Sequence, residues 1–121
     1  MPPIYVLVYA HDGELTGELP DEARVEAAVE SFRMLADPTR LRIMWLLGAG
    51  ERDVTDLSEA VGAARPAVSQ HLAKLRLAGL VAVRREGRRA VYRVRGGHVQ
   101  RLLAEALGAA EHQVTGAPEH P

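Results

Sequence analysis

Cysteine is absent from this 121-residue chain, and its absence excludes disulfides, thiolate metal sites and cysteine nucleophiles. Long apolar runs are absent as well. The longest, residues 4–10, is far shorter than the roughly 20 residues that a transmembrane helix needs. This run also lacks the basic flank of a secretory signal, so we expect a cytoplasmic protein without a membrane partner. The length fits one domain whose core needs no disulfide or metal.

The chain also lacks a large net charge, at −1, but its charges are sharply segregated. Residues 1–64 hold five arginines against twelve acids, and residues 102–121 hold three acids and no base. Between them, residues 65–101 hold nine arginines and one lysine against Glu86 alone, a local charge of +9. Such a segment favours a polyanionic partner. A solvated basic surface is the alternative interpretation.

Hydrophobic periodicity predicts a mainly helical domain over residues 21–112. We expect helices over residues 21–36, 38–47, 54–61, 65–78 and 97–112. Asp37 followed by Pro38 is typical of a helix start, and Asp53 with Asp56 has the spacing of a capping box. The helix over residues 38–47 is mostly apolar, so we expect it to lie in the core with Trp45 included.

A β-hairpin and two terminal extensions complete the expected fold. Two β-rich runs, residues 80–85 and 89–94, are joined by Glu86 and Gly87. The predicted fold class is therefore mainly α with a small β-hairpin wing, a winged helix-turn-helix. Residues 1–20, with strand composition at 4–9, are expected to be a flexible arm, and residues 113–121 a flexible tail.

The fourth predicted helix and the hairpin carry groups suited to double-stranded DNA. With Val68, Leu72 and Leu75 turned inward, the opposite face of the helix is expected to point outward. Gln reads adenine edges, and Ser, His, Lys and Arg reach bases or phosphates. The predicted DNA-binding residues are Arg65, Ser69, Gln70, His71, Lys74, Arg84, Arg85, Arg88 and Arg89.

Two stretches of the chain resemble the ArsR/SmtB family of winged-helix repressors. Residues 32–43 (FRMLADPTRLRI) are similar to the family's opening helices. Residues 68–75 (VSQHLAKL), with Gly79 and the REGR turn at 85–88, are similar to its recognition helix and wing. The likeness covers roughly residues 22–113. It implies a homodimer whose binding to operator DNA responds to a small inorganic signal.

The last predicted helix holds candidate metal ligands. Without cysteine, imidazole and carboxylate groups are left, and these suit nickel or cobalt, with zinc as a third candidate. His98, Glu105 and His112 recur every seven residues, hence on one face. His98 and His112 lie about 21 Å apart along a helix, too far to share an ion. Two antiparallel copies crossing near Glu105 would bring His98 of one beside His112 of the other.

The spacing therefore predicts two symmetric sites between subunits, with ordinary surface histidines as the alternative. The resemblance modifies this ligand set. The family's commonest zinc and cobalt sensors have ligands at the positions that Gly96 and Ala109 occupy here. The nickel- and cobalt-sensing branch, to which the chain is similar from Phe32 onwards, implies His98, Glu111, His112 and His120 as ligands. Only one tail histidine is present where that branch has two.

The dimer is expected to form through the first and last helices. Their apolar stripes, with Phe32 and Leu35 on one and Leu103 and Leu107 on the other, are wider than a small wing domain covers alone. One alternative keeps the DNA-binding module but takes the metal signal from a partner protein. An enzyme is not expected, because Ser69 and His71 do not face each other on a helix and no orienting group accompanies them.

Overall fold

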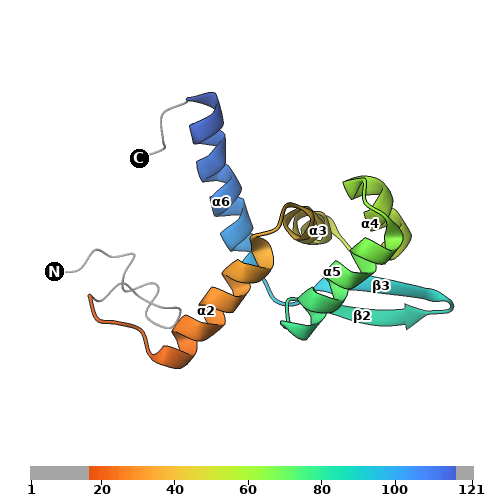
Figure 1. Cartoon of the computed structure of the whole chain (residues 1–121), viewed down its shortest axis with the longest axis horizontal. Helices are drawn as coiled ribbons and strands as arrows, with labels where there is room; N and C mark the ends of the chain where they lie inside the picture. Colours follow the sequence, from red (N-terminus) through yellow and green to blue (C-terminus); the bar gives the residue numbers. More distant parts are fainter. Residues whose placement is uncertain (1–16, 117–121) are drawn as a thin grey trace. The chain divides into compact units, whose positions relative to one another are not determined.

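The computed structural model describes residues 17–116. Residues 31–116 belong to one compact unit, and residues 17–30 belong to a second that contributes the first part of α2. Figure 1 shows the helices and the paired strands in chain order. The elements are α2 (Glu22–Leu35), α3 (Pro38–Ala49), β1 (Arg52–Asp53), α4 (Val54–Val61), α5 (Arg65–Leu77), β2 (Val81–Glu86), β3 (Arg89–Val94) and α6 (His98–Thr115). The predicted fold class, mainly α with a β wing, is confirmed.

The core is formed where α3, α4, α5 and α6 converge. Three apolar side chains at one- to four-residue spacing are buried on each of α3 and α5, and α4 and α6 each add one buried leucine. The largest fully buried side chains are Ile43, Met44, Leu57, Leu72, Leu75, Leu103, Val68 and Val81. The expectation for α3 is wrong at one position. Trp45 is 50% exposed, because Ile43, Met44 and Leu47 already fill the side of α3 that faces the core.

Side-chain caps start α3 and α4 where the sequence predicts them. The Asp37 carboxylate accepts a hydrogen bond from the Arg40 backbone N–H at 2.9 Å. Asp53 accepts one from the Asp56 backbone N–H at 2.8 Å. Each bond satisfies a donor that a helix N-terminus leaves without an intrahelical partner. Gly62, at φ +69°, ends α4 in the left-handed region and starts the turn into α5.

The wing is a three-stranded antiparallel sheet in the order β1-β3-β2. The predicted hairpin is present, with Arg85 opposite Ala90 and Glu86 opposite Arg89. Its turn lies at Gly87 and Arg88, one residue later than predicted, because Glu86 is still paired. The strand β1 pairs Arg52 with Tyr92 and Asp53 with Val91. The hydrophobic pattern did not predict this strand, since two residues are too few to show alternation.

Helix α6 continues past the expected domain end at residue 112. It reaches Thr115 and ends where Gly116, at φ +72°, donates its backbone N–H to the His112 carbonyl at 2.9 Å. Residues 113–115 therefore belong to the helix and not to the tail. The strand-like segment at residues 4–9 and the candidate ligand His120 lie outside the described residues. Within residues 17–116, no helix has the length and apolar character to span a membrane.

Candidate nucleic-acid interface and metal ligands

Five of the nine predicted DNA-binding residues line one pocket between the start of α5 and the wing. The pocket has a volume of about 400 Å³. The five residues are Arg65, Ser69, Arg85, Arg88 and Arg89. Helix α5 begins at this pocket without a side-chain cap, since its N-cap is Ala64. Guanidinium groups and a helix N-terminus without a side-chain cap thus meet at one place, an arrangement suited to phosphate.

Helix α5 presents its predicted inner and outer faces, with one exception. Val68, Leu72 and Leu75 are fully buried, whereas Gln70 and Lys74 are exposed. These two side chains follow the pocket along the same helix and are available to a groove of DNA. Their contacts with DNA stay a prediction.

The exception is His71, which does not point outward as expected. Its side chain is 21% exposed and lies against the α2–α3 corner. Arg40 Nη1 is 3.3 Å from His71 Nδ1, and Asp37 Oδ2 is 3.9 Å from His71 Nε2. Because a guanidinium only donates, Nδ1 accepts and Nε2 carries the ring proton toward the carboxylate. The imidazole therefore has partners within the chain, which the helical pattern alone did not indicate.

Arg40 and Asp37 connect the α2–α3 corner to His71 of α5, a contact that the sequence pattern did not predict. The Arg40 Nε–H donates to the Met34 carbonyl at 2.7 Å, so Arg40 joins the last turn of α2 to α5. The Arg40 backbone N–H is the main cause that lowers the pKa of Asp37, and the adjacent His71 ring and the Arg40 guanidinium lower it further against opposing desolvation. An ionised Asp37 thus serves both as the cap of α3 and as the partner of His71.

Two of the four predicted wing arginines are held by carboxylates. Arg84 pairs with Glu51 and, at 2.9 Å, with Glu86. Arg89 Nε donates to Asp53 at 3.0 Å, and Arg89 Nη1 lies 3.9 Å from Glu86. Hydrogen bonds from these arginines to the carboxylates raise the pKa of both guanidiniums.

The remaining basic residues of the interface differ from this pair. Within the described part of the chain, no ion pair is formed by Arg65, Lys74, Arg85 or Arg88. The candidate interface therefore holds two kinds of basic residue: Arg84 and Arg89, which carboxylates neutralise, and the four residues without an ion pair.

Three of the four candidate metal ligands, His98, Glu111 and His112, lie on α6, and the described part of one chain does not bring them together. His98 and Glu111 are exposed and His112 is half-buried. Among residues 17–116, no three histidine or acidic side chains cluster closely enough to hold a metal ion. Arg101 would compete with a metal ion for His98, because Arg101 Nη2 is 2.9 Å from His98 Nδ1. Since the guanidinium can only donate, Nδ1 accepts and Nε2 carries the proton.

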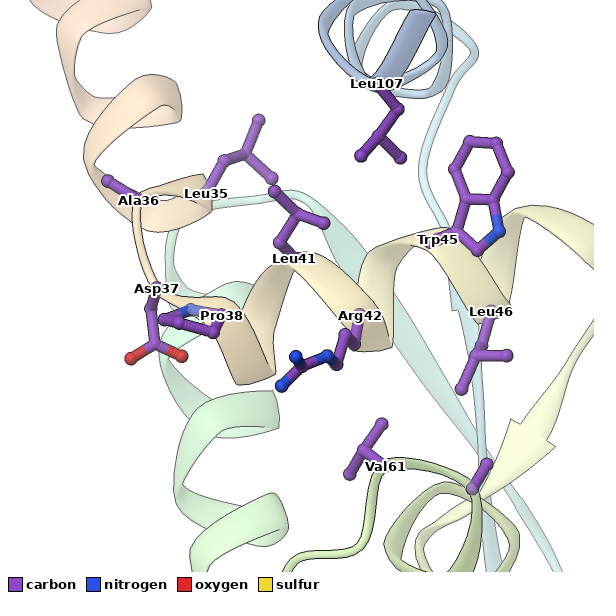
Figure 2. A pocket seen from close by; sticks show the side chains of 11 residues that line it. Leu35, Ala36, Asp37, Pro38, Leu41, Arg42, Trp45, Leu46, Val61 and Leu107 are labelled. Carbon is purple, nitrogen blue, oxygen red and sulfur yellow. The ribbon is translucent and has the colours of Figure 1, made fainter. Parts of the chain in front are cut away.

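An apolar groove adjoins the middle of α6. Figure 2 shows Leu107 of α6 pointing toward α3, whose Leu41 and Trp45 line the same groove. The groove has a volume of about 770 Å³ and continues toward Leu35 and Val61. Leu107 and Leu41 are only half-buried. The groove thus leaves apolar surface open beside α6 in the single chain.

The fold and the interface define a winged helix-turn-helix DNA-binding domain. A homodimeric domain of this kind from Mycobacterium bovis superposes with a TM-score of 0.72 at 32% identity, covering 88% of this chain and 100% of that chain. The chain belongs to the ArsR family of bacterial transcriptional regulators, since residues 37–83 match "Bacterial regulatory protein, arsR family". Two relatives match over most of their length.

Both relatives are HTH-type transcriptional regulators of Mycobacterium tuberculosis. KmtR is 47% identical over 113 residues, which are 93% of this chain and 85% of KmtR. NmtR is 40% identical over 112 residues, which are 91% of this chain and 93% of NmtR. The chain is accordingly a transcriptional regulator and not an enzyme.

Proposed function

We propose that this chain is a homodimeric repressor that binds operator DNA through α5 and the wing, and that nickel or cobalt at the dimer interface changes its affinity. The observation that carries the DNA-binding part is the arginine-lined pocket at the start of α5. The guanidiniums of Arg65, Arg85 and Arg88 there neutralise backbone phosphates and fix the register of the helix, while Gln70 and Lys74 reach the groove.

Exposed apolar side chains support a dimer through α2 and α6. Val25, Val29 and Phe32 of α2 are 43%, 46% and 55% exposed, and they recur at the spacing of one helix face. Leu107 of α6 lines the open groove. Two residues first assigned to the dimer contact are placed differently. Leu35 and Leu103 are 7% and 1% exposed and belong to the core of the chain itself.

Phe32→Asp should therefore shift the protein from dimer to monomer, because a charge would be buried at the contact between subunits. Sedimentation velocity over a range of protein concentrations measures this shift. Leu77→Asp is the matched control, since Leu77 is 92% exposed at the end of α5 and belongs to neither helix assigned to the dimer contact. A Phe32→Asp protein that stays dimeric would contradict the arrangement. Leu103→Asp is unsuitable as a test, because it would disrupt the core.

The residues on α6 fit a metal bound between subunits. His98, Glu111 and His112 offer imidazole and carboxylate groups, a set that nickel, cobalt and zinc accept. The described part of one chain assembles no site, in keeping with ligands contributed by two chains. A metal at either nitrogen of His98 requires the Arg101 contact to break, because Nδ1 now accepts from Arg101. A metal at Nδ1 would take the place of Arg101, and a metal at Nε2 would leave the ring proton on Nδ1, which could then no longer accept. His120 is proposed as a further ligand from the resemblance to the nickel- and cobalt-sensing branch.

DNA binding measured with and without metal tests the whole proposal. The probe is a fluorescent duplex from the region upstream of the protein's own gene, with a random duplex as control. Nickel or cobalt, added after a chelator has been removed, should change affinity for the upstream duplex by roughly 5- to 150-fold. If the isolated chain binds that duplex but shows no heat with either nickel or cobalt in calorimetry, the partner-protein alternative replaces the metal site. If it fails to prefer the upstream duplex, operator recognition there is wrong.

A further inference from the structure

The carboxylates around the wing occupy the same guanidinium groups that DNA phosphates would need. Glu86 contacts both Arg84 and Arg89, and Glu51 holds Arg84 from the loop after α3. Glu86 is the only acid among residues 65–101. In the sheet, Arg84 and Glu86 are two residues apart on β2 and therefore lie on one face of it. The single acid of the basic segment is thus placed where it neutralises two wing arginines.

We propose that Glu51 and Glu86 compete with the DNA backbone for Arg84 and Arg89 and so lower the protein's affinity for DNA of any sequence. This inference rests on the proposed DNA-binding function and concerns how strongly that surface binds. Arg84 and Arg89 remain 43% and 54% exposed, so a phosphate can approach them once the carboxylates leave. Surface ion pairs of this kind are weak, and a polyanion can displace them.

The competition has a consequence for sequence discrimination. Binding to random DNA depends almost entirely on phosphate contacts, whereas base contacts act only at the correct site. Wing arginines that are paired with carboxylates of the same chain weaken the phosphate contacts and do not affect the base contacts made by α5. Arg65, Arg85 and Arg88, without ion pairs among the described residues, keep the phosphate contacts that position the helix.

The competing view is that these ion pairs merely stiffen the wing. It makes the opposite prediction, because loss of a structural ion pair would loosen the wing and weaken DNA binding. Asp53 is left out of the test, since its carboxylate also caps α4 and its removal would disturb the helix-turn-helix.

Glu86→Gln and Glu51→Gln, alone and combined, are compared with Glu59→Gln on a fluorescent random duplex. Glu59 is an exposed acid of α4, so its substitution makes the same charge change as either single variant, and half that of the combined variant, outside the wing. The combined variant should bind about tenfold more tightly, and Glu59→Gln only about twofold more tightly. The log–log salt slope should steepen by about 0.9 for each arginine that newly reaches a phosphate. Unchanged or weaker binding by the combined variant overturns the proposal.

A double-mutant cycle with Arg84→Ala separates direct competition from a general charge effect. In the Arg84→Ala background, Glu51→Gln should act no more strongly than Glu59→Gln, because the guanidinium it would release is gone. An equal gain with and without Arg84 would show that only overall charge matters. Thermal melting followed by circular dichroism confirms that each variant is folded. If the wild-type chain binds the duplex and the carboxylate variants gain nothing, this inference fails while the DNA-binding function stands. If the wild-type chain binds no DNA at all, both fail.

Discussion

Nickel binding should return when His98→Ala protein is mixed with His112→Ala protein, although each variant alone has lost it. Each substitution removes one ligand from both proposed sites of its own homodimer, and the affinity should fall by roughly 100-fold or more. In a heterodimer, one site receives both defects and the other receives neither. One site in every heterodimer should then bind with the affinity of the wild type. Calorimetry with nickel after subunit exchange measures this recovery.

The double variant His98→Ala/His112→Ala, mixed with wild-type chain, is the matched control. If the ligands of a site come from two chains, both sites of this heterodimer are broken and nickel binding should fall with exchange. If the ligands come from one chain, its wild-type half keeps an intact site, and the first mixture recovers nothing. The two mixtures therefore give opposite results under the two arrangements. Recovery absent from the first mixture, with exchange confirmed by mass spectrometry, would contradict a site shared between subunits.

The local features of this fold could be read from the sequence because short-range physics determines them. Asp37 before Pro38, and Asp53 three residues before Asp56, predict helix starts that the structure shows with their capping hydrogen bonds. The apolar spacing of Val68, Leu72 and Leu75 predicts the buried face of α5. Each of these signals lies within a few residues of its effect.

The features that could not be predicted depend on residues far apart in the chain. His71 has the helical position of an outward residue, but Arg40 and Asp37, more than thirty positions earlier, hold it at the α2–α3 corner. Leu103 and Leu107 look alike in a helical pattern. Only the packing shows that Leu103 belongs to the core and that Leu107 lines an open groove. A periodic apolar stripe indicates that a helix face is buried, but it does not show whether the same chain or another subunit covers that face.

The same limit applies to charge. The sequence indicates that residues 65–101 are strongly basic, and this is sufficient to predict a polyanionic partner. It does not show which guanidiniums are already bound to carboxylates, because Glu51 and Asp53 come from a segment more than thirty residues earlier. The distinction matters for a quantitative prediction, since an arginine bound to a carboxylate and a free one contribute differently to phosphate binding.

Replacing Arg85 and Arg88 together with Ala should therefore reduce the salt sensitivity of DNA binding by about half. Four basic residues per chain, Arg65, Lys74, Arg85 and Arg88, have no ion pair in the part of the chain that the structure describes. If all four contact phosphates, a dimer neutralises about eight, and the log–log slope of affinity against salt is about −7. Removing two per chain should bring the slope to about −3.6, at roughly 0.9 per phosphate.

The loss should be equal for the upstream duplex and for a random one, because phosphate contacts carry no sequence information. Arg42→Ala combined with Arg101→Ala makes the same charge change on α3 and α6 and should leave the slope nearly unaltered. An unchanged slope in the wing variant would remove the wing from the interface, and an equal change in the control would reduce the effect to overall charge. A slope for the wild type well beyond −7 would mean that Arg84 and Arg89 also reach phosphates, so that DNA displaces their carboxylates even in the unmodified protein.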